Sequence, residues 1–165
     1  MKHQIKITFI LIFFTGFCFS QSIDTISLKR KAFKDYKACT KYYEGKNLEK
    51  YSKYVHPIIV KQIGKEKLLL ENNLSLKNTK RSVVETGKIF FDNQVYQFEF
   101  TESMISEVNN IEKSNNYSVI AMSYDKGINW VFFNAYDSIE RMLKDIPELN
   151  SHLKVKNVPK LNFQF

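Results

Sequence analysis

The chain has 165 residues, with 25 Lys and Arg against 17 Asp and Glu, and a formal net charge of +8. This length accommodates one domain rather than two. Five Gly and three Pro exclude a collagen-like or linker-dominated chain. A composition of 44% hydrophobic and 15% aromatic residues excludes intrinsic disorder, so the sequence predicts a globular domain.

The first twenty residues have the organisation of a secretory signal peptide. A basic head at residues 2–6 precedes residues 7–19, which carry no charge and are fewer than the roughly 20 that span a bilayer as a helix. Cys18 and Ser20 supply small side chains at the third and first positions before a cut between Ser20 and Gln21. We therefore expect an exported protein, periplasmic or extracellular after cleavage.

Two alternatives to cleavage stay open. One is a retained N-terminal anchor, and the other is a lipid anchor at Cys18, which the bulky Phe17 before it disfavours. Removal of residues 1–20 takes away two lysines and no acid, which leaves a net charge of +6 and Cys39 as the single thiol. The exported domain would then contain no internal disulfide and would depend on its hydrophobic core.

The N-terminal part of residues 21–165 predicts helices. Apolar residues recur at three- and four-residue spacings over residues 25–44, which predicts an amphipathic helix that Gly45 ends. Asn47 is placed to cap a short second helix, and Pro57 suits the first turn of a third helix. Residues 65–74 predict a fourth helix.

From about residue 75 the pattern changes to strands. Residues 88–91 and 94–102 flank a two-residue turn signal, Asp92-Asn93. Over residues 94–102 aromatic residues alternate with polar ones, which predicts a sheet with one apolar face and one wetter face. Residues 105–116 are polar and rich in Asn, which predicts a loop.

The C-terminal third predicts two central strands and a last helix. Residues 117–124 and 128–135 are apolar on both faces, and the turn at 125–127 joins them. Asp137, followed by Glu140 at capping-box spacing, predicts the start of the helix. The tail from residue 153 is expected to add a short strand. Helices followed by an antiparallel sheet define an α+β domain over residues 21–165.

Element order and spaced motifs together resemble the NTF2-like (cystatin-like) superfamily, and in detail its small exported bacterial members of uncharacterised function. The motifs are Y-Y-E-G-K-N-L at 42–48, Y-V-H-P at 54–57, G-K-E-K at 64–67 and I-P at 146–147. The resemblance implies a cone in which N-terminal helices pack in the concavity of a curved antiparallel sheet. It covers roughly residues 25–155 and says little about chemistry.

Residues 123–130 fit the pattern S-x-D-x-G-x-x-W and look like the Asp-box hairpin of sialidases. Asp125 is placed to accept backbone N–H groups across the bend, Gly127 tolerates positive φ, and Trp130 is expected to pack beneath. Asn129 stands where the pattern usually has Thr. The single copy predicts a structural turn, and carbohydrate binding by this hairpin remains a second hypothesis that rests on analogy.

His56 is the best single catalytic candidate, because it precedes a helix start and its pKa range suits acid–base work. Some NTF2-like enzymes use a His/Asp pair, but no Asp is placed by sequence beside His56. The favoured hypothesis is that His56 packs at a helix junction and bonds a backbone carbonyl. Cys39 is a weaker nucleophile candidate with His56 as its base, and a buried apolar thiol is favoured over it.

The remaining site classes are disfavoured. His56, His152 and one Cys give no recognisable metal-ligand spacing, so we expect no metal and no cofactor. The lysine-rich run at 29–41 is expected to be the solvated face of its helix. Nucleic acid is not an expected partner of an exported chain. The lysine-rich run is more plausibly used for weak attraction to anionic surface polymers or membrane headgroups.

If the chain forms the cone, a group of aromatic residues and His56 either fills the concavity or lines a ligand pocket there; filling is favoured, and the pocket is the main functional hypothesis. The group comprises Tyr36, Tyr43, Tyr54, His56, Tyr96, Phe98, Phe100, Trp130 and Phe132.

These observations predict a non-enzymatic exported domain that binds a small apolar ligand or a protein partner in the cell envelope. The alternative is a small isomerase or hydrolase of the NTF2-like kind with His56 as general base. Homodimerisation through the outer sheet face is a third hypothesis, although Gln97 and Glu99 do not make that face obviously adhesive.

Overall fold

The computed structural model describes residues 24–72, 79–108 and 111–156, and the structural statements below refer to these ranges. The expected signal peptide, the cut after Ser20, the anchor alternative at Cys18 and most of the expected C-terminal strand lie outside them.

The N-terminal helices begin and end close to the predicted residues. Helix α2 spans Thr25–Glu44, and the Asp24 side chain caps it by accepting from Ser27 N at 3.0 Å. Helices α3 (Leu48–Tyr51) and α4 (Pro57–Ile63) are capped by the side chains of Asn47 and His56. The prediction over 65–74 is corrected: Lys65–Asn72 is a 3₁₀ segment, in which Leu68 is the one buried residue among those whose burial is described.

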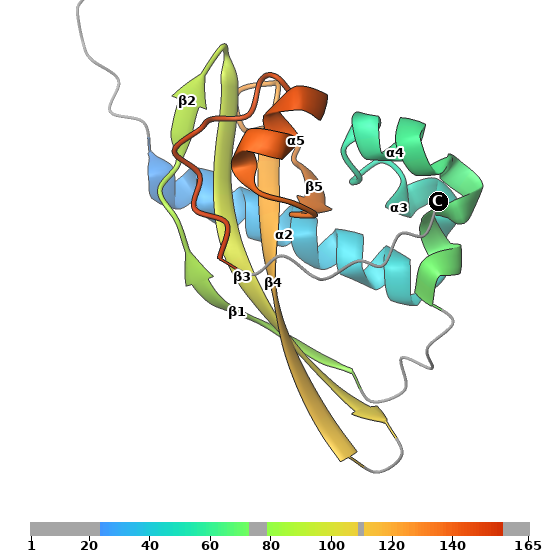
Figure 1. Ribbon diagram of the computed structural model, residues 1–165. Helices are drawn as coiled ribbons and strands as arrows, with labels where there is room; N and C mark the ends of the chain where they lie inside the picture. The colour runs from blue at the N-terminus through green and yellow to red at the C-terminus, as the bar shows by residue number, and fades with distance from the viewer. Residues whose placement is uncertain (1–23, 73–78, 109–110, 157–165) are drawn as a thin grey trace, which may run out of the picture.

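Five strands form one curved antiparallel sheet that does not close on itself (Figure 1). The order is β1-β3-β4-β5, and β2 pairs with β3 on the same side as β1. The strands are β1 (Lys80–Thr86), β2 (Phe90–Asp92), β3 (Val95–Val108), β4 (Ile111–Ser123) and β5 (Val131–Asn134).

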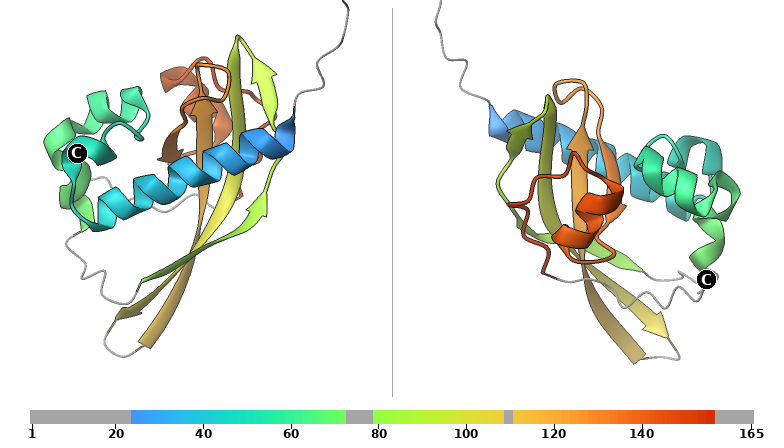
Figure 2. Two further views of the ribbon diagram at one scale, coloured as in Figure 1. Left: turned by 180° about the vertical axis from the view of Figure 1, so that it is seen from behind. Right: turned by 45° about the horizontal axis from the view of Figure 1, so that its top comes forward.

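Helix α2 crosses the inner face of the sheet, as the left view of Figure 2 shows. The alternating rings of β3 point toward it: Phe98 and Phe100 are fully buried and pack with Ala32 and Cys39 of the helix. The apolar stripe predicted for residues 25–44 therefore faces the sheet, which confirms the predicted amphipathic helix.

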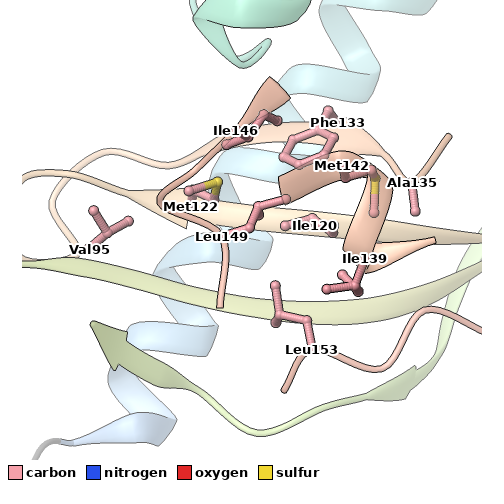
Figure 3. Packing of buried hydrophobic residues seen from close by; sticks show 10 residues of the cluster. All are labelled: Val95, Ile120, Met122, Phe133, Ala135, Ile139, Met142, Ile146, Leu149 and Leu153. Atoms are coloured by element: carbon pink, nitrogen blue, oxygen red, sulfur yellow. The ribbon is translucent and has the colours of Figure 1, made fainter. Parts of the chain in front are cut away.

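Helix α5 (Ile139–Asp145) and the segment that follows it cover the outer face (Figure 2, right). A second core lies beneath them, and Figure 3 shows its side chains converging from β4, β5, α5 and the C-terminal segment. Its buried members are Val95, Ile120, Met122, Phe133, Ala135, Ile139, Met142, Ile146, Leu149 and Leu153. Ser138 occupies the N-cap position of α5 without a side-chain capping hydrogen bond, so the predicted start at Asp137 is too early.

The sequence predicts that one face of β3 is exposed to solvent, and in the body of the domain this prediction is wrong. Gln97, Glu99 and Thr101 are all buried, at 0%, 8% and 8% exposure, because residues 148–156 lie over them. The Gln97 amide donates to Glu148 O and accepts from Asn150 N, both at 2.8 Å. Gln97 and Ser118, whose hydroxyl accepts from Lys156 N at 3.1 Å, thus hold the backbone of the C-terminal segment, which leaves little of this face for homodimerisation.

The predicted loop at 105–116 is also wrong. Strands β3 and β4 remain paired from Tyr96↔Ser123 out to Val108↔Ile111. Polar residues are compatible with this pairing because backbone hydrogen bonds hold a ribbon that is not buried. Strand β1 was not predicted, and the first hairpin turns at Asn93-Gln94, both at positive φ, rather than at Asp92-Asn93.

No helix among the described residues has the length and hydrophobicity needed to cross a membrane.

Candidate functional site

His56 lies where the helical segment meets the edge of the sheet. Its backbone N–H donates to Phe132 O at 3.1 Å, and Phe132 N donates to Tyr54 O at 2.7 Å, so residues 54–56 run beside β5. Because Pro57 lacks an N–H and fixes the first helical turn, His56 becomes the N-cap of α4. The imidazole is 3% exposed and packs against the Phe133 ring, with centroids 5.3 Å apart.

Both nitrogens of the His56 ring have partners. The backbone N–H of Ile58 donates to Nδ1 at 3.3 Å, and Nε2 lies 2.6 Å from the hydroxyl of Tyr124. Since Nδ1 accepts, the proton of the neutral ring sits on Nε2 and is donated to Tyr124. Tyr124 in turn donates to Glu148 Oε1 at 2.9 Å. The three residues form a directed chain of hydrogen bonds, named here the His–Tyr–Glu relay.

The surroundings favour neutral His56 and protonated Tyr124. Burial lowers the pKa of His56 below its ordinary value, and the negative charge of Glu148, 4.0 Å from Nε2, partly opposes that shift. Burial raises the pKa of Tyr124, and its hydrogen bond to Glu148 raises it further. The relay therefore keeps an uncharged imidazole beside an uncharged phenol.

Tyr124 is the accessible member of the relay. It is 47% exposed, whereas His56 is buried and Glu148 is partly covered. A molecule at this surface meets the tyrosine ring and the carboxylate first. The lone pair of Nδ1, which a general base would use, is engaged in capping α4. This arrangement makes His56 a structural residue that also polarises the Tyr124 hydroxyl.

The Cys39 hypothesis finds no geometric support. Cys39 is 5% exposed and belongs to the core between α2 and the sheet, whereas the His56 ring packs on Phe133 of the opposite core. Burial raises the pKa of the Cys39 thiol to about 12. A thiol in this state is inert as a nucleophile.

The structure places most of the proposed pocket residues in direct ring contact. Tyr36 meets Phe100 and Phe132 with centroids 4.8 and 5.1 Å apart, and Phe98 meets Trp130 at 5.5 Å. Such edge-on pairs fill space between α2 and the sheet. Tyr36, Phe98, Phe100, Trp130 and Phe132 form this group, and Tyr54 and Tyr96 pack against its edge. Tyr43 instead lies tilted against Tyr51, and His56 lies in the relay.

An ion pair between a buried Glu102 and a partly buried Arg81 adjoins these rings. Arg81 of β1 donates from Nη1 to Glu102 Oε2 at 2.9 Å, and its Nε lies 3.4 Å from Glu44 Oε1 of α2. Burial raises the pKa of Glu102, while the Arg81 charge and a hydrogen bond from Tyr36 oppose that shift. This cluster joins the C-terminal end of α2 to the sheet.

The hairpin at 123–130 is hydrogen-bonded within itself. Asp125 Oδ1 accepts from Ser123 Oγ at 2.9 Å and from Asn129 N at 2.8 Å, and its Oδ2 accepts from Asn129 Nδ2 at 2.6 Å. The Trp130 indole donates to Gly127 O at 3.1 Å and is 1% exposed. Both oxygens of Asp125 are thus engaged in the turn, and these hydrogen bonds lower the pKa of Asp125 although its burial opposes the shift.

Sequence reasoning missed Tyr124 and Glu148 as partners of His56, and Arg81 with Glu102 as an ion pair. The relay joins residues 68 and 24 positions apart along the chain. One signal was available for the ion pair: Glu102 falls on the apolar side of the alternation in β3, where a carboxylate needs a cationic partner. Within the described ranges, no group of three or more His, Cys, Asp or Glu is placed to hold a metal ion.

Three comparisons with known proteins returned nothing: no family model, no curated protein and no solved structure matches this chain.

Proposed function

We propose that the protein is an exported domain of the NTF2-like cone type whose role is to bind, without catalysis, a partner in the cell envelope. Of the two expected ligand classes, a small apolar molecule and a protein, the geometry favours a protein. The signal-peptide pattern of residues 1–20 supports export. The curved sheet with a long helix across its inner face supports the cone.

The observation that carries this proposal is a projecting part of the sheet, named here the β-arm. It consists of β1, residues 103–108 of β3 and residues 111–116 of β4. Figure 1 shows the arm extending past the helices. Burial ends at its base: Thr101, Glu102 and Ser118 are buried, whereas residues 114–116 are exposed. A narrow ribbon without a second layer is only marginally stable by itself, so contact with a partner would stabilise it.

Strand β1 adds an accessible edge to the arm. Val83 and Val84 are 40% and 57% exposed, and within the described ranges β1 pairs with β3 alone. An edge of this kind presents backbone donors and acceptors that an extended segment of another protein is able to pair with. By contrast, the rings between α2 and the sheet already contact one another, which leaves an apolar small molecule little room.

In-cell photo-crosslinking tests the proposal. A photoreactive residue at Ile105 in the arm should give a discrete adduct with another protein, whereas the same residue at Lys144 on α5 should not. Both positions lie at the surface or partly so, and neither is part of a core. Adducts at Lys144 alone, or none in either variant with the protein exported and folded, would contradict the arm as a binding surface.

A second candidate function, an isomerase or hydrolase that uses His56, is favoured by one observation, the His–Tyr–Glu relay. The half-exposed hydroxyl of Tyr124 lies between an imidazole and a carboxylate, and it would donate to a developing oxyanion by turning its one proton away from Glu148. Turnover of activated esters or of an enolisable ketone, reduced at least tenfold by Tyr124→Phe and by His56→Asn, would support this candidate. Turnover that both variants retain would reject it.

A further inference from the structure

The excess positive charge of the chain is concentrated in its helical part. Residues 24–72 hold twelve Lys and Arg against six Asp and Glu, a net charge of +6. The described residues from 79 onward hold nine Lys and Arg against eleven Asp and Glu, a net charge of −2. The two halves of the domain therefore differ in sign, and an anionic surface would orient the molecule with its helices toward it.

Four basic residues of α2 form one row on the side of the helix away from the sheet. Arg30, Lys34, Lys37 and Lys41 follow one another at spacings of four, three and four residues, which places them on one helical face. All four are exposed, and they lie opposite Ala32 and Cys39, which face the core. This set is named the basic row.

Acidic side chains do not neutralise the basic row. Asp35 pairs with Lys31 at 2.6 Å on the flank of the helix, Glu44 lies against Arg81, and Asp24 caps the first turn. None of the four basic residues makes an ion pair with any residue that the structure describes. Their charges are available to an external anion.

The shape of this face fits an extended plane. Helix α2 has 20 residues and lies across the inner side of the sheet above the β-arm, so its outward side forms one long surface (Figure 2, left). Ile26, one turn before Arg30 on the same side, is 70% exposed. An exposed apolar residue in line with four cations suits a lipid interface, which takes up apolar side chains and attracts basic ones.

We propose that the basic row of α2, with Ile26 at its N-terminal end, binds the surface of an anionic lipid bilayer. The contact is electrostatic and reversible, because one isoleucine buries too little apolar surface to insert the helix. It would hold the domain against a membrane with the β-arm directed elsewhere. The proposal does not depend on the function of the arm or of the relay.

Vesicle co-sedimentation of the protein as recovered from its producing cell tests this proposal. The protein should sediment with vesicles of phosphatidylglycerol mixed with phosphatidylcholine, and not with pure phosphatidylcholine vesicles. The variant R30Q/K34Q/K37Q/K41Q should lose about a hundredfold or more in affinity, since each basic residue near such a surface contributes roughly a fivefold factor. Raising the salt concentration should release the wild type, because screening shortens the reach of these charges.

A matched control separates position from net charge. The variant K88Q/K126Q/K144Q/K154Q removes the same four charges from exposed positions outside α2 and should bind within threefold of the wild type. Ile26→Ser should weaken binding severalfold without changing net charge. The proposal would be overturned if the two fourfold variants lost the same affinity for anionic vesicles, or if the wild type bound neutral and anionic vesicles equally. Binding to double-stranded DNA without binding to anionic vesicles would also overturn it.

Discussion

Gly127 packs so closely against Leu28 that a Cβ atom at position 127 would lie 2.2 Å from Leu28 Cδ2. The hairpin at 123–130 thereby docks on the first turns of α2, with the Trp130 ring 3.9 Å from the same position. Gly127 also has φ of +85°, a conformation that other residues rarely adopt. The Asp-box-like turn therefore links β4 and β5 to the long helix.

The first prediction concerns this contact. Gly127→Ala should lower the free energy of unfolding by about 2–4 kcal/mol, from positive φ and from the clash with Leu28 together. Leu28→Ala is the matched background, because it removes the side chain that a Cβ atom at position 127 would meet. In that background Gly127→Ala should cost only about 1–2 kcal/mol, the amount that positive φ imposes. Urea denaturation measures both, and an equal cost of Gly127→Ala with and without the Leu28 side chain would contradict the contact.

The second prediction concerns the pH dependence that His56 confers. Its pKa in the folded protein lies below the ordinary value of 6.5. The unfolded chain then binds more protons, so His56 supports stability above pH 6.5, and this support is lost as the pH falls through the folded pKa. His56→Asn keeps a good N-cap without titrating. It should flatten the fall in stability below pH 6.5, as denaturation at several pH values would show.

Glu148 opposes the shift of His56, so Glu148→Gln should lower the pKa of His56 further. Imidazole resonances followed by NMR titration measure this shift directly. They also report the tautomer, which should carry its proton on Nε2. An Nδ1-protonated ring, or a pKa of His56 that rises in the Glu148 variant, would contradict the relay.

The third prediction concerns the Arg81–Glu102 pair. Arg81→Met leaves the Glu102 carboxylate buried with Tyr36 as its remaining partner, and should destabilise the fold by about 3–5 kcal/mol at neutral pH. The stability lost in Arg81→Met should be smaller at acidic pH, because a protonated Glu102 is neutral and needs no positive charge beside it. The double variant R81M/E102L should be more stable than R81M at neutral pH, and a double variant that is less stable would show that the pair is not coupled.

The fourth prediction concerns the stability of the β-arm. Ser103 and Asn116 face each other across β3 and β4, so the sequence Asn-Gly in place of residues 104–115 would close the hairpin there. Among the removed residues whose side chains are described, Met104, Ile105, Ser114 and Asn115 belong to neither core, and the pairing lost with β1 is that of Lys80 and Arg81. The free energy of unfolding should therefore fall by only about 1–2 kcal/mol. A large loss of stability would mean that the arm supports the fold rather than a partner.

The fifth prediction concerns the Cys39 thiol. With its pKa raised to about 12 by burial, Cys39 should resist a thiol reagent in the folded protein and react at once in denaturant. Its labelling rate, followed against urea concentration, then reports global opening. Rapid labelling under native conditions would contradict the packing of α2 on the sheet.

The helices were predictable because their signals are local. Periodicity and Gly45 placed α2 over residues 25–44, and a proline after His56 placed the start of α4. The paired rings of β3 likewise marked its inner face. In these segments the periodicity and the helix-ending residues are local features of the chain, so the sequence alone carries the information.

The arm and the outer face depended on distant contacts and were not predictable in the same way. Residues 105–116 are polar, and only their mutual pairing makes them strands. The alternation in β3 predicted that Gln97 and Glu99 face solvent, because no feature of that strand indicates that residues 148–156 cover them. The partners of His56 are similarly brought together by the fold, from the end of β4 and the segment after α5.

Native mass spectrometry of the protein purified from its producing cell examines export and the β-arm together, because it weighs both the mature chain and any protein bound to it. An exported domain that binds a protein through its β-arm should give the mass of residues 21–165 in complex with a second protein, and should lose that complex when Asn-Gly replaces residues 104–115. An unprocessed chain that begins at Met1, or a complex that the shortened variant retains, would contradict it.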